Sequence, residues 1–191
     1  MDHNLHFTGD EAADRLLSTD PLALVIGMLL DQQVTMESAF AGPHKLHGRL
    51  GGFDAERLAG IDLEELTEVM RQTPAVHRYP GSMAKRIIAL SAAVLDDYGG
   101  DVSRVWTDGD PDGPEILRRL KKLPGFGEQK AKIFLAVLGK RCGLEAPGWR
   151  EAAGEYGEDG ARRSIADVVD KQSLHEVRET KRAAKAAAKR S

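Results

Sequence analysis

The stretch Leu-Pro-Gly-Phe-Gly at residues 123–127 separates two segments with helical periodicity, and it limits how those helices can be joined. Its proline fixes φ near −65° and has no N–H group, and its glycines can adopt a positive φ. Leu123 and Phe126 are apolar and can turn into a core. The stretch therefore predicts a tight hairpin between a helix over 115–122 and a helix over 128–138.

The remainder of the chain also favours helices, because no window combines alternating polarity with β-branched residues. Start signals such as Asp20-Pro21 and stop signals such as Gly51-Gly52 bound the apolar runs. We predict further helices over 22–30, 35–50, 63–70, from 80 to a stop at 99–100, and over 164–169. The fold class expected is all-α, a two-lobed helical bundle with a helix-hairpin-helix element. The domain spans 1–170, with the hairpin element at 114–140, and a mobile basic tail follows at 171–191.

Charge is distributed unevenly along the chain, although the net charge is only −3. Residues 114–142 carry a net +6 and residues 171–191 a net +5, within an otherwise acidic body. Two basic blocks indicate a surface that binds a polyanion. The alternative is that the lysines only decorate solvated helix faces.

The hairpin has the features of an anion-binding site. The helix after Gly127 presents unpaired N–H groups at its start, and Lys130 and Lys132 lie in its first turns. Such groups suit a phosphate and carry no sequence information. The alternative is a helical corner whose glycines serve packing only.

Three segments in order resemble one known family. They are LVIGMLLDQQVTMESA at 24–39, RYPGSMAKRIIALSAAVLDDYGGDV at 78–102, and the hairpin with the lysines that follow it. Together they cover roughly residues 21–145, and they are similar to the helix-hairpin-helix GPD superfamily of base-excision repair proteins. The resemblance implies a DNA glycosylase fold and double-stranded DNA containing a damaged base as the partner.

The resemblance also implies roles for the hairpin. Gly125 and Gly127 would offer backbone N–H groups to a phosphate, with Phe126 between them. The backbone carbonyls of Lys121, Leu123 and Phe126 would hold a monovalent cation, K⁺ or Na⁺. The residues expected to contact DNA are Gln32, Gln33, Gly125, Phe126, Gly127, Gln129, Lys130 and Lys132.

Two glutamines carry further implications of the resemblance. Gln33 matches the position of a side chain that fills the gap left by an extruded base, and Gln32 lies beside it; the alternative is a polar helix end. Gln129 stands where bifunctional members carry a Schiff-base lysine. Lys130 comes one residue later, turned about 100° around the helix, so we expect no lyase through a Schiff base at this position.

The family's catalytic aspartate has no counterpart at the matching distance, because that count reaches residues 146–148. Cleavage of a glycosidic bond develops positive charge at C1′, which a carboxylate stabilises. The candidates are Glu145, close to the expected position, and Asp31, beside the glutamine pair. The alternative for Glu145 is a solvent-exposed acid in a loop.

Composition restricts cofactors and location. With the single Cys142 there is no four-cysteine iron–sulfur cluster, and we expect no required cofactor. No apolar run is long enough to cross a bilayer, so we expect no membrane partner. We also expect a monomer and a cytoplasmic location, on the nucleoid if the protein is bacterial. The leading function is a monofunctional DNA N-glycosylase. The alternatives are a non-catalytic binder of damaged or abasic DNA with the same fold, and a helical protein–protein module.

Overall fold

The computed structural model describes residues 4–188, and within that range it contains helices and no strand. The all-α class expected from the sequence is confirmed. None of the helices in the described range is both long and apolar enough for a bilayer crossing. In chain order the elements are α1 (Glu11–Thr19), α2 (Pro21–Leu30), α3 (Met36–Leu50), α4 (Ala55–Gly60), α5 (Leu63–Arg71), α6 (Pro80–Tyr98), α7 (Arg104–Thr107), α8 (Gly113–Leu120), α9 (Glu128–Arg141), α10 (Trp149–Ala153), η1 (Gly154–Tyr156), η2 (Ile165–Asp167) and α11 (Lys171–Ala188).

Local signals in the sequence start and end several of these helices. The Asp20 carboxylate accepts hydrogen bonds from the N–H groups of Leu22 and Ala23, and Pro21 occupies the first position of α2. Thr35 caps α3, which ends at Gly51 in the left-handed conformation. These ends agree with the ranges predicted for both helices, because caps depend on neighbouring residues only.

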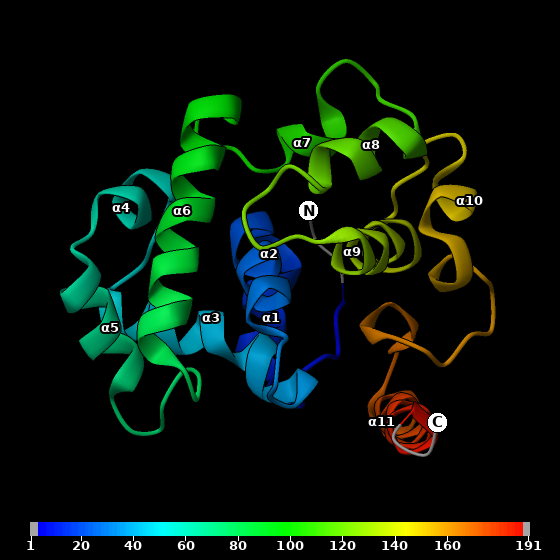
Figure 1. Cartoon of the computed structure of the whole chain (residues 1–191), viewed down its shortest axis with the longest axis horizontal. Helices are drawn as coiled ribbons and strands as arrows, with labels where there is room; N and C mark the ends of the chain where they lie inside the picture. Colours follow the sequence, from blue (N-terminus) through cyan, green and yellow to red (C-terminus); the bar gives the residue numbers. More distant parts are fainter. Residues whose placement is uncertain (1–3, 189–191) are drawn as a thin grey trace.

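The helices form two groups around one apolar core (Figure 1). On one side α4 and α5 pack on α6, and on the other α8, α9 and α10 pack together. Helices α1 and α3 pack on α2, in which every residue after the first proline is buried. Because α2 is apolar all around, it fills the centre of the molecule. Its carboxyl-terminal end meets the first turns of α9.

The C-terminal helix α11 packs on the body through its first turns. Leu174 and Val177 are buried members of the core, although the tail was expected to be mobile from residue 171. An apolar pair at i and i+3 is sufficient to hold one face of a helix. The domain boundary at residue 170 stays a prediction, but the packing of α11 does not end there. Residues 189–191 of the predicted tail lie outside the described residues.

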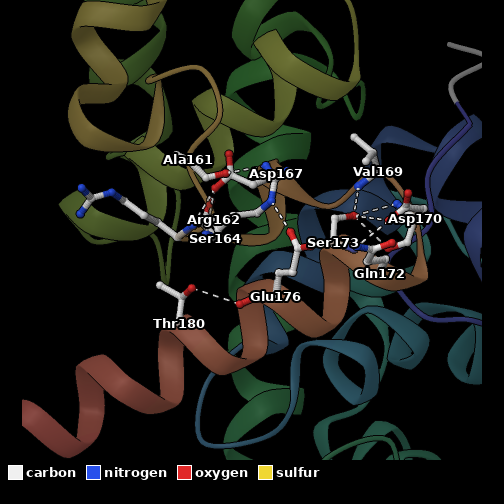
Figure 2. Close-up of polar contacts among 11 residues, drawn as sticks. Ala161, Arg162, Ser164, Asp167, Val169, Asp170, Gln172, Ser173, Glu176 and Thr180 are labelled. Atoms are coloured by element: carbon white, nitrogen blue, oxygen red, sulfur yellow. Dashed lines mark hydrogen bonds and ion pairs between the residues drawn. The ribbon is translucent and has the colours of Figure 1, made fainter.

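A series of hydrogen bonds connects the segment before α11 with the first turns of that helix (Figure 2). The Ser164 hydroxyl and the Asp167 carboxylate form a reciprocal cap around η2. Asp167 also accepts a hydrogen bond from Lys140 of α9 at 2.7 Å, in a pair whose side chains are 6% and 3% exposed. The Ser173 hydroxyl oxygen then accepts hydrogen bonds from the N–H groups of Val169 and Asp170, both at 2.9 Å. These contacts fix where α11 begins relative to α9.

Replacing Ser173 with alanine is expected to lower the free energy of unfolding by about 1–3 kcal/mol, because two N–H groups lose their acceptor. The matched control is Thr180→Ala on the exposed side of the same helix, where the hydroxyl only donates to the Glu176 carbonyl (Figure 2). The free energy of unfolding of this control should change by less than about 0.5 kcal/mol. Urea denaturation followed by circular dichroism measures both. Equal changes in the two variants would contradict this assignment.

Candidate active site

A cleft of about 690 Å³ opens where the end of α2, the loop after it, the start of α9 and one side of α11 meet. It brings together predicted site residues that lie about one hundred positions apart in the sequence. A larger groove of about 810 Å³ lies beside α1 and the start of α11 and contains none of them. The cleft is lined by Met28, Asp31, Gln32, Gln33, Val34, Thr35, Arg78, Gln129, Lys130, Ile133 and Lys181.

Gln32 fixes the loop that follows α2. Its side-chain amide donates to the Leu29 carbonyl at 2.8 Å, and its side-chain oxygen accepts from the Arg86 guanidinium at 3.1 Å. Its main-chain carbonyl lies 3.0 Å from Nε2 of the buried His77. The His77 Nδ1 accepts from the Tyr79 N–H, so Nε2 carries the proton and donates to Gln32. Gln32 therefore has its polar groups engaged within the protein.

Gln33 differs from its neighbour. It is exposed, and its φ of 57° places a non-glycine residue in the left-handed region. A backbone in this region costs about 1–3 kcal/mol and persists only where the surroundings impose it. The hydrogen bonds of Gln32 supply that constraint. Of the two glutamines, Gln33 is the one whose side chain is accessible at the cleft.

Asp31 ends α2 and lies in the cleft. Its side chain is only 14% exposed, and the Lys181 ammonium lies 3.8 Å from its carboxylate. The carboxyl end of a helix carries partial negative charge, which disfavours a carboxylate there. The ammonium of Lys181 offsets that repulsion, and the charge of Lys130 also interacts with Asp31. The structure therefore places a shielded carboxylate close to one ammonium group and within the field of a second.

Lys130 reaches from α9 to the end of α2. Its ammonium donates to the Leu29 carbonyl at 3.0 Å. Burial lowers the pKa of Lys130 to about 8, with Asp31 opposing the shift and Arg86 adding to it. Part of the population is therefore neutral in mildly alkaline solution.

This pKa predicts a pH dependence of stability. Between about pH 8 and 10.5 the unfolded chain holds a proton at Lys130 that the folded protein has released. Binding of more protons by the unfolded state makes the free energy of unfolding rise with pH. The stability of the wild type relative to Lys130→Met should therefore increase from pH 7 to pH 10. Urea titrations of both proteins at several pH values measure the difference, and a constant difference would contradict the shift.

The predicted hairpin joins α8 to α9. Leu123 and Phe126 are buried, as expected, and Gly125 has a φ of 86°. A Cβ on Gly125 would lie 2.3 Å from a methyl group of Leu29, whereas one on Gly127 would meet no atom within 4 Å. Gly127 caps α9 with a φ of −72°, so only the first of the two glycines uses the positive φ that both can adopt. The hairpin thus packs on Leu29, the same residue whose carbonyl binds Lys130.

Other hairpin side chains are engaged within the protein. Lys121 and Lys132 both pair with the Glu128 carboxylate, at 2.8 and 3.0 Å, and they lower the pKa of Glu128 to about 2. The Gln129 amide donates to the Tyr156 hydroxyl at 2.9 Å. Lys132 does not line the cleft, whereas Gln129 does.

Three carbonyls at the hairpin were expected to hold a monovalent cation. The Leu123 oxygen accepts a hydrogen bond from the Phe126 N–H at 3.0 Å, which leaves its second lone pair. Within residues 4–188, no backbone N–H donates to the oxygens of Lys121 or Phe126 outside the helices. Neutral carbonyl oxygens suit K⁺ or Na⁺. The residues fit such an ion, and the site stays a proposal.

Glu145 lies away from the cleft. It is exposed in the loop after α9, whereas the cleft is at the first turns of that helix. A helix of 14 residues is about 21 Å long. The structure therefore brings Asp31, and not Glu145, into the cleft between the Gln33 loop and the start of α9.

Two cations near the cleft, Arg78 and Arg86, were missing from the sequence prediction, and Lys181 was expected only as one of the cations of the basic tail. Arg78 and Lys181 line the cleft, and Arg86 binds the loop through Gln32. The Arg78 guanidinium stacks 4.9 Å from the centre of the exposed Tyr79 ring. For Lys181 the available signal was its spacing of four and seven residues from Val177 and Leu174, which places it on the packed face of α11.

Two comparisons with known proteins found similar sequences. The family model described as HhH-GPD superfamily base excision DNA repair protein matches residues 26–190. Endonuclease III of Thermotoga maritima is 28% identical over 130 residues, a match that covers 66% of this chain. The match covers 51% of that relative, so the chain spans about half of its length.

Proposed function

Because this chain belongs to the HhH-GPD superfamily of base excision DNA repair proteins, we propose that it is a monofunctional DNA N-glycosylase. Its substrate is double-stranded DNA with a damaged or mispaired base, and it acts as a monomer. The observation that carries the proposal is the position of Asp31. This carboxylate is shielded from solvent and lies in the cleft between the Gln33 loop and the start of α9.

Asp31 performs the electrostatic part of the reaction. As the N-glycosidic bond breaks, its electron pair leaves with the base and C1′ becomes positively charged. A fixed carboxylate in a poorly solvated cleft stabilises that charge. Water then attacks C1′, and its proton passes to the carboxylate or to the departing base. The products are the free base and an abasic sugar.

DNA binding uses three groups around the cleft. The N–H groups at the hairpin and the cations Arg78 and Lys130 attract backbone phosphates. Gln33 enters the gap in the duplex when the base leaves the stack, which offsets part of the cost of unpairing. A K⁺ or Na⁺ ion at the hairpin carbonyls would stiffen the turn, and hydrolysis requires no other cofactor. A repair enzyme of this kind works in the cytoplasm, on the chromosome.

Strand cleavage is not part of the proposed activity. Gln129, at the position where a lyase would need an amine, donates its amide to Tyr156. The Lys130 amine is directed to the Leu29 carbonyl rather than into open space. The enzyme should therefore leave an intact strand with an abasic site.

Base release from duplex oligonucleotides tests the proposal. The panel contains uracil, hypoxanthine, 3-methyladenine and oxidised purines, and strands are analysed before and after alkali. Release of one base with scission only after alkali supports a monofunctional glycosylase. Scission without alkali, together with borohydride trapping that Lys130→Met abolishes, would contradict the monofunctional assignment.

A non-catalytic binder of damaged or abasic DNA is the second candidate. One observation favours it: the Lys181 ammonium lies 3.8 Å from the Asp31 carboxylate and opposes the positive charge that the reaction would develop. Such a protein would bind abasic duplex tightly and release no base from any member of the panel. The same oligonucleotides therefore separate the two functions.

A further inference from the structure

The face of α11 that packs on the body changes from apolar to basic along its length. Leu174 and Val177 enter the core, and one turn later the same face carries Arg178 and Lys181. Arg178 pairs with Glu37 of α3 at 2.9 Å, and Lys181 approaches Asp31 at 3.8 Å. The helix therefore leaves the apolar core and crosses the loop that holds the proposed catalytic carboxylate.

The two ion pairs differ in closeness. The Arg178–Glu37 pair lies at hydrogen-bond distance, and the second carboxylate oxygen of Glu37 is buried without a hydrogen-bond partner. The Lys181–Asp31 distance exceeds that of a hydrogen bond, and the Lys181 side chain is 40% exposed. Lys181 is thus the cation that is not fully committed to its carboxylate.

A groove of about 300 Å³ runs between α11 and the segment 34–37, and it shares Val34, Thr35 and Lys181 with the cleft. The groove is lined by three basic side chains, Arg178, Lys181 and Arg182. Glu37 is the single acidic residue in its lining. A basic groove that continues from the cleft matches the charge of a polyanionic strand. The hairpin lies on the α9 side of the cleft, so the groove offers a second place for the backbone.

We propose that this groove binds a phosphate of the DNA backbone and that Lys181 exchanges Asp31 for that phosphate when DNA binds. The inference rests on the proposed function. In the free protein Lys181 screens the negative charge of Asp31. In the DNA complex the Lys181 ammonium moves to the phosphate. The Asp31 carboxylate then stabilises the positive charge at C1′ without being screened. The carboxylate is therefore fully active only with DNA in the groove.

The salt dependence of binding tests the phosphate contact. The probe is a duplex with a tetrahydrofuran abasic analogue, which binds without being processed. Each lost phosphate contact reduces the slope of log K against log salt by about 0.9. We expect this reduction for Lys181→Met and its restoration in Lys181→Arg. The control Lys171→Met removes the same charge about 15 Å away on α11 and should leave the slope unchanged.

A double-mutant cycle tests the exchange. Asp31→Asn should tighten binding more strongly with Lys181 present than in Lys181→Met, because only the wild-type lysine is released from Asp31. Equal tightening in the two backgrounds overturns the exchange. Gly127→Asp should still weaken binding if the proposed function holds. In that case, an unchanged salt slope in Lys181→Met overturns the phosphate site. An equal reduction of the slope in Lys171→Met overturns it as well. If the wild type does not bind the duplex at low salt, the proposed function itself fails.

Discussion

Replacing Asp31 with asparagine is expected to slow base release by about 10²–10³-fold, measured in single turnovers with enzyme in excess. The amide preserves the shape of the side chain and removes the charge that stabilises C1′. Affinity for an abasic duplex should be retained or improved, because a negative charge leaves a basic cleft. Slow chemistry with intact binding is therefore the result that identifies a catalytic carboxylate.

Glu145→Gln is the matched control for this experiment. It makes the same chemical change in an exposed loop beyond the far end of α9. The rate should be that of the wild type. Full activity of Asp31→Asn would remove Asp31 from the mechanism, and a slow Glu145→Gln would mean that the loop reaches the cleft in the DNA complex.

Much of the helical fold could be predicted because its signals are local. The caps at Asp20, Thr35 and Gly51 depend on residues within one turn. Helices α1, α4, α7 and α10 were not predicted. Three of these have six residues or fewer, which is too short for a clear apolar period.

The candidate site could be predicted only where its residues are close together in the sequence. The hairpin and the neighbourhood of Gln33 and Asp31 come from continuous segments. Glu145 was placed by counting residues past Leu123, but α9 runs to Arg141 and carries the next loop away from the cleft. Lys181 lies 150 positions from Asp31, and no local pattern indicates that contact.

Leu29 connects the two parts of the site. Its side chain contacts the hairpin at Gly125, and its carbonyl accepts hydrogen bonds from Gln32 and Lys130. The hairpin and the loop that follows α2 are therefore held at a fixed separation through one residue. Substitutions in the hairpin can act on binding or on this junction, and the two glycines separate these effects.

Alanine at Gly125 is expected to lower the free energy of unfolding by about 2–5 kcal/mol. The left-handed backbone costs an alanine about 1–2 kcal/mol, and overpacking against Leu29 adds about 1–3 kcal/mol. For a chain of this size the melting temperature should fall by about 5–15 °C. Thermal denaturation followed by circular dichroism measures the change.

Alanine at Gly127 is the same substitution two residues later, with the opposite expected result. The added methyl group meets no protein atom, and the φ of −72° suits any residue, so stability should change by less than about 0.5 kcal/mol. Neither packing nor conformation within the protein therefore requires a glycine at position 127. Under the proposed function, a glycine is required here for the close approach of a DNA phosphate to the start of α9. Affinity for the abasic duplex should fall about 10–100-fold as charge-assisted N–H contacts lengthen. Wild-type affinity in Gly127→Ala would mean that the backbone does not approach the hairpin.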